Sequence, residues 1–73
     1  MTRFEIIIGF MFANINQYID ELYYAKSKDS LHYYQLINNI ITNINRDLEE
    51  ELLEPLNSDE RKAVIQEIEH ILN

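Results

Sequence analysis

Residues 4–25 read FEIIIGFMFANINQYIDELYYA, and apolar side chains recur along them in alternating steps of four and three residues. This spacing keeps the apolar side chains on one side of an α-helix, as in the seam of a coiled coil. The seam residues are Phe4, Ile8, Met11, Ile15, Tyr18, Leu22 and Ala25. The pattern therefore predicts a helix over about residues 3–26.

The start of this segment leaves a second structure open. Between Phe4 and Phe12 the side chains are apolar on nearly every side. Ile and Phe favour strands, and Gly9 weakens a helix by about 1 kcal/mol, so a strand over residues 4–12 is the alternative. Glu5 and Asn14 bracket only eight residues, which is too few for a membrane span. No small-residue cleavage site follows, so we expect a cytoplasmic protein rather than a secreted one.

A second helix is predicted over about residues 30–54. Asp29 is the preferred N-cap in the polar connection before it, because its short acceptor side chain can receive a free N–H group of the first turn. Pro55 is expected to end the helix, because the residue before a proline is pushed out of the helical region. The predicted core side chains are Tyr34, Ile37, Ile41, Ile44, Leu48 and Leu52.

A third helix is predicted over about residues 58–72. Asn57 and Glu60 match a capping box, in which the N-cap residue and the third helical residue each receive the backbone N–H of the other. The connections between the helices are short, so neighbouring helices are expected to run antiparallel. The expected fold is an all-α, antiparallel three-helix bundle with two long helices and one short helix. Its third helix would bury Val64, Ile65, Ile68, Ile71 and Leu72.

The composition indicates one small domain over residues 1–73. The chain has no cysteine, which excludes disulfides, thiolate metal sites and cysteine nucleophiles. Six basic side chains against thirteen acidic ones give a net charge of −7, which argues against direct binding of nucleic acid. In so small a chain the free-energy cost of the lost conformational entropy nearly cancels the free energy gained by burying apolar surface. Self-association is therefore expected to supply the missing stability.

Tyrosines gather at one end of the predicted bundle, near the first connection. The third helix is expected to be too short to reach this end, which would leave two helices to bury a large apolar surface. Tyrosine is also over-represented at protein interfaces. We therefore expect an interface here, with a second copy that completes the bundle or with another partner. The alternative is that the rings cover the hairpin as ordinary amphipathic side chains. The residues are Tyr18, Tyr23, Tyr24, Tyr33 and Tyr34.

Acidic side chains dominate the opposite end, since residues 32–73 contain nine acidic and three basic side chains. Four of the carboxylates are spaced to share one face of the second helix, where acids near a C-terminus oppose the helix dipole. The hypothesis is a negative patch that docks a basic protein surface, such as the nucleic-acid channel of a nuclease, a polymerase or a defence effector. The alternative is an ordinary solvated surface. The patch residues are Asp47, Glu50, Glu51, Glu54, Asp59 and Glu60.

Few residues could carry chemistry. Glu67 and His70 have the spacing found in di-iron carboxylate bundles, and Asp29 and His32 repeat it loosely, so a carboxylate–histidine metal bundle is one alternative. Such a site would also need inward-facing carboxylates on other helices, which the pattern does not predict. The serines are explained as helix caps, and a thin bundle offers no evident substrate cavity. We therefore expect no enzyme activity, no catalytic residues, no metal and no cofactor.

The favoured function is that of a small, acidic, non-enzymatic interaction protein that binds and blocks another macromolecule, presenting a surface like that of a nucleic acid. Nuclease immunity proteins, antitoxins and phage-encoded inhibitors of host defences have similar size and charge, although no motif connects the chain to them. A homodimeric regulatory bundle that binds nucleic acid is a further alternative. The basic side chains form no continuous stripe, which counts against it.

Overall fold

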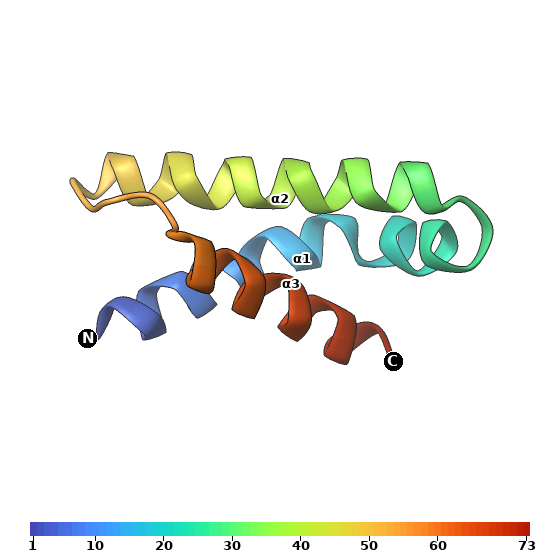
Figure 1. The fold of residues 1–73 in the computed structure, drawn as a ribbon, viewed down its shortest axis with the longest axis horizontal. Helices are drawn as coiled ribbons and strands as arrows, with labels where there is room; N and C mark the ends of the chain where they lie inside the picture. The colour runs from blue at the N-terminus through green and yellow to red at the C-terminus, as the bar shows by residue number, and fades with distance from the viewer.

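Three helices and no strands make up the chain in a computed structural model that describes residues 1–73. They are α1 (Arg3–Lys28), α2 (Ser30–Glu50) and α3 (Ser58–Leu72). Asp29 joins the first two helices, and Figure 1 shows α2 returning alongside α1, with α3 lying on the same side of α2 as α1. The predicted all-helical class is confirmed, and the strand alternative for residues 4–12 is wrong.

A capping box that the sequence analysis overlooked starts α1. The hydroxyl of Thr2 accepts the N–H of Glu5 at 3.2 Å, and the Glu5 carboxylate accepts the N–H of Thr2 at 3.0 Å. Two otherwise unpaired backbone donors are satisfied in this way, which favours a helix over a strand at this point. The apolar seam is also rotated at the start of α1. Ile7 is buried there, whereas Phe4 is exposed and Ile8 is half-buried.

The second helix ends at Glu50, four residues before the predicted end. The N–H of Leu52 donates to the carbonyl of Glu49, and the N–H of Leu53 donates to the carbonyl of Leu48, each at 2.9 Å. These two bonds form a Schellman motif, which needs a residue in the left-handed conformation. Leu52 occupies that position with φ of 60°, where glycine is the usual residue. The left-handed turn, rather than Pro55, therefore ends α2.

The position of α3 follows from this early turn. After α2 ends, the chain bends back until the N–H of Leu56 donates to the Asn45 side chain at 2.8 Å. Since α3 begins opposite Asn45 instead of at the tip of α2, its far end reaches the tyrosines. There the hydroxyl of Tyr23 lies 3.3 Å from the Ile71 carbonyl, and Lys26 Nζ lies 2.6 Å from Asn73 Oδ1. The prediction that only two helices cover this end is therefore wrong.

The core lies along the centre of the bundle, and α2 contributes the largest share of it. Asn14 is the one buried polar residue, and its amide donates to the Phe10 carbonyl one turn earlier at 2.8 Å. None of the three helices combines the length and apolarity that crossing a membrane requires. The buried apolar residues are Ile7, Met11, Ile15, Leu22, Ala25, Tyr33, Leu36, Ile37, Ile40, Ile41, Ile44, Leu48, Val64, Ile68 and Leu72.

Candidate functional site

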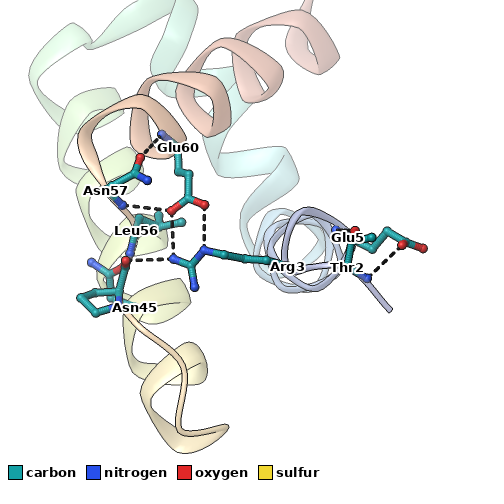
Figure 2. A network of polar contacts seen from close by, with 8 residues as sticks. Thr2, Arg3, Glu5, Asn45, Leu56, Asn57 and Glu60 are labelled. Atoms are coloured by element: carbon teal, nitrogen blue, oxygen red, sulfur yellow. Dashed lines mark hydrogen bonds and ion pairs between the residues drawn. The ribbon is translucent and has the colours of Figure 1, made fainter.

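An arginine from the first turn of α1 ties together the elements at one end of the bundle. Arg3 Nε lies 2.8 Å from Glu60 Oε2, and its Nη2 lies 2.9 Å from Glu60 Oε1 and 3.0 Å from the Pro55 carbonyl. Figure 2 shows the guanidinium reaching from α1 to both groups. The start of α1, the connection after α2 and the start of α3 therefore meet here. We call this region the acidic end.

Glu60 uses its carboxylate in hydrogen bonds within the chain. Its carboxylate accepts two N–H groups of Arg3 and the backbone N–H of Asn57, which begins α3. The hydrogen bond from Arg3, followed by that from Asn57, lowers the pKa of Glu60 from its ordinary value of 4.5 to about 2. Of the predicted patch residues, Glu60 is thus the one with a charged partner within the chain.

The other five patch residues lie on three segments rather than on one helix face. Because α2 ends at Glu50, Glu51 caps the helix and Glu54 falls in the connection, so the predicted single face is wrong. Asp59 lies in the first turn of α3, where it suits the positive end of that helix. The charge of Glu54 contributes to raising the pKa of Arg3, after the larger effect of Glu60. These carboxylates therefore lie on the last turn of α2, in the connection after it and at the start of α3, and Arg3 ties the connection and α3 to the start of α1. The five residues are Asp47, Glu50, Glu51, Glu54 and Asp59.

Glu5 also belongs to the acidic end, although the sequence analysis did not include it. Its carboxylate accepts hydrogen bonds from Thr2, and these lower the pKa of Glu5. Glu5 and Glu51 line the same groove of about 660 Å³, between the first turns of α1 and the connection after α2. We call it the Gly9 groove. Its lining residues are Met1, Glu5, Ile6, Gly9, Phe10, Glu51 and Leu53.

A second groove of about 650 Å³ lies between α1 and α3. Its apolar lining comes mainly from α1. Its polar lining includes Glu60, which is paired with Arg3, and His70 near the end of α3. The lining residues are Phe4, Ile7, Ile8, Asp59, Glu60, Ala63, Val64, Gln66, Glu67 and His70.

The opposite end, which we call the aromatic end, is partly covered by the chain itself. Tyr33 is only 7% exposed, so it is not available to a partner, and burial raises the pKa of its hydroxyl. Tyr18 is half-buried. Tyr24 and Tyr34 are 66% and 61% exposed, and Leu31, in the first turn of α2, is 69% exposed although it was not predicted as part of this surface. A smaller exposed surface than predicted therefore remains.

The histidines do not gather with carboxylates into a metal site. His32 Nε2 lies 3.8 Å from Glu21 Oε2, and the Asp29 carboxylate is used to cap α2 by accepting the N–H of His32. No group of three or more His, Asp or Glu side chains is close enough together to hold a metal ion. The metal-bundle alternative therefore has no geometric basis.

The fold and its two ends define a small, acidic three-helix bundle. Comparisons with protein-family models, with curated proteins and with solved structures find no match. The acidic end and the aromatic end are therefore the features from which a function can be inferred.

Proposed function

We propose that this chain is a non-enzymatic interaction protein that binds the basic surface of another protein through its acidic end and blocks that surface. The observation that carries the proposal is the convergence of carboxylates from α1, α2, the connection and α3. Of these, Glu60 alone has an ion-pair partner in the chain. Glu5 contributes to the capping box of α1 and Asp59 suits the start of α3, whereas no side-chain hydrogen bond or ion pair uses Asp47, Glu50, Glu51 or Glu54.

Local energetics support this proposal. Glu50 and Glu51 lie at the C-terminus of α2, where negative charge opposes the helix dipole, and neighbouring carboxylates repel one another. A basic partner would relieve both penalties when it docks. It would also be drawn in by long-range attraction, which accelerates association at low salt.

The chemistry of the acidic end favours a partner whose basic surface ordinarily holds nucleic acid. Carboxylates there would take the place of phosphates and compete with the nucleic acid. A nuclease, a polymerase or a defence effector has such a surface, and the chain would then act as an immunity protein, an antitoxin or a phage-encoded inhibitor.

Capture of partners with charge-reversed variants tests this proposal. Glu50→Lys/Glu54→Lys reverses two carboxylates at the acidic end, and Asp20→Lys/Glu21→Lys makes the same change in net charge on exposed residues of α1 nearer the aromatic end. We expect the wild type and the control variant to retain a common set of basic proteins, quantified by mass spectrometry, and the acidic-end variant to lose it. Equal retention by both variants, or equal loss, would contradict the proposal.

A second candidate function is homodimerisation through the aromatic end, and a separate observation supports it. Tyr24, near the end of α1, and Leu31 and Tyr34, near the start of α2, are each more than 60% exposed. Residues 18–34 carry two basic and three acidic side chains, so two copies would meet there with little repulsion. A second copy would complete the antiparallel bundle by covering these rings.

Sedimentation equilibrium tests the dimer. We expect the wild type to dimerise at micromolar concentration, and Tyr24→Ser/Tyr34→Ser to be monomeric. Phe4→Ser/Phe12→Ser removes two exposed aromatic rings elsewhere on α1 and should leave the dimer intact. A monomeric wild type, or a dimer lost only in the control, would contradict this candidate.

A further inference from the structure

Two residues that are locally unfavourable border the Gly9 groove. Gly9, the only glycine of the chain, lies inside α1, where glycine is a poor helix former. Its φ is not positive, and a Cβ built there meets no atom within 4 Å. Neither backbone conformation nor packing therefore requires glycine at this position. Gly9 does line the groove, and the space where its side chain would stand is open.

Leu52 is the second such residue. It holds the left-handed position of the turn after α2, which glycine would fill without strain, and its side chain is 95% exposed. Its neighbours on both sides, Glu51 and Leu53, line the groove. A large apolar side chain is thus held in solvent between two groove residues of the chain, at a cost in backbone strain. Residues that break local rules in this way concentrate at functional sites.

The groove has an apolar floor and a charged rim. Ile6, Phe10 and Leu53 provide apolar surface, while Glu5 of α1 and Glu51 at the end of α2 each contribute a carboxylate. Neither carboxylate has an ion-pair partner in the chain. A second copy of this chain is disfavoured as the occupant, because its own acidic end would be repelled. A segment with both apolar and cationic side chains fits.

The backbone around the groove favours a helical segment. One wall is α1, whose backbone groups are hydrogen-bonded within the helix, and the chain has no strand whose edge an extended peptide could join. A bound segment must therefore satisfy its own backbone hydrogen bonds, which a helix does.

We propose that the Gly9 groove receives an apolar side chain from a basic amphipathic helix of the partner protein. Lysine or arginine side chains on either side of it pair with Glu5 and Glu51, and Leu52 packs against the helix. This proposal rests on the proposed function, since it specifies how the acidic end recognises a basic partner.

The probe is a model peptide of leucine and lysine arranged with helical periodicity. In a ¹H–¹⁵N titration of the full chain, we expect the largest shift changes at Ile6, Gly9, Phe10, Glu51 and Leu53. One control peptide replaces lysine with glutamate, and the other alternates leucine and lysine with strand periodicity; neither should bind. Shifts centred on Ala63 and His70, in the groove between α1 and α3, would overturn the proposal.

Variants that fill each groove give a matched comparison. Gly9→Leu fills the Gly9 groove, and because open space surrounds the position the variant should remain folded, which circular dichroism checks. Ala63→Leu adds a similar bulk in the other groove. We expect Gly9→Leu to weaken peptide binding about tenfold or more, and Ala63→Leu to leave it within about twofold of wild type. The reverse pattern, or equal effects, would overturn the proposal.

Failure of the groove and failure of the acidic end give different results. If Gly9→Leu binds the peptide as wild type does while Glu50→Lys/Glu54→Lys loses it, the groove proposal is wrong and the acidic end still binds basic partners. If the wild type, Gly9→Leu and Glu50→Lys/Glu54→Lys all bind the peptide equally, both the groove proposal and the proposed function are wrong. An absence of peptide binding even at low salt would overturn both.

Discussion

Arg3 Nε lies 2.8 Å from Glu60 Oε2, so the first turn of α1 is joined to the first turn of α3 across the acidic end. The same guanidinium donates to the Pro55 carbonyl at 3.0 Å, which fixes the connection between α2 and α3. Through these contacts Arg3 holds the start of α1, the connection after α2 and the start of α3 together. The integrity of the pair can be tested separately from any partner.

Stability should fall in acid as Glu60 takes up a proton. Its pKa is lowered from 4.5 in an unfolded chain to about 2 in the folded protein, mainly by the hydrogen bond from Arg3. A lowered folded-state pKa stabilises the protein above pH 4.5, and this contribution is lost as the pH falls towards 2. Urea unfolding measured across this window should show the loss.

Glu60→Gln is the control for this pH dependence. Glutamine can still accept the N–H of Asn57 in the capping box, but it does not titrate and forms no ion pair. We expect this variant to be less stable than wild type at pH 7 and to lose less stability between pH 4.5 and 2. An acid dependence equal to that of wild type would show that Glu60 is not the responsible group.

Leu52→Gly should stabilise the protein by about 1 kcal/mol, because glycine holds the left-handed conformation without the steric cost that leucine pays. Leu52→Ala keeps the Cβ and removes a side chain that is 95% exposed, so it should change the free energy of unfolding little. Urea denaturation of the three proteins measures both effects. A destabilised Leu52→Gly variant would contradict the left-handed turn.

Gly9→Ala should raise the free energy of unfolding by about 0.5–1 kcal/mol, because alanine is the better helix former and its Cβ meets open space. Ala13→Gly makes the opposite change at an exposed position one turn further along α1 and should destabilise by a similar amount. Thermal unfolding followed by circular dichroism compares the two variants. Destabilisation by Gly9→Ala would mean that packing requires the glycine.

Tyr33→Phe should leave stability unchanged or raise it by up to about 1 kcal/mol. The Tyr33 hydroxyl is buried without a hydrogen-bond partner in the single chain, so removing it costs no hydrogen bond. Chemical denaturation at dilute protein concentration measures the effect. A loss of more than about 1 kcal/mol would contradict an unpaired hydroxyl at this position.

Local signals made the helices predictable from sequence. Asp29 and Asn57 cap α2 and α3 as predicted, because an N-cap acts through hydrogen bonds to residues only three positions away. The start of α1 carried the same kind of signal in Thr2 and Glu5, so it could have been predicted as well.

Features that depend on contacts between distant segments were not predictable. Leucine gives no indication of a left-handed turn, so Leu52 could not show that α2 ends at Glu50. The hydrogen bond between Asn45 and Leu56, which sets where α3 begins, exists only in the folded chain. The same is true of the groove that Glu5 and Glu51 both line, which adds a carboxylate to the acidic end.

The most direct test of the acidic end is the association rate constant of the captured partner, measured by stopped flow over a salt series. We predict a rate constant that falls steeply with ionic strength and that Glu50→Lys/Glu54→Lys lowers about tenfold or more at low salt. Asp20→Lys/Glu21→Lys should retain most of the wild-type rate. A rate constant that is independent of salt, or that the two variants lower equally, would contradict binding through the acidic end.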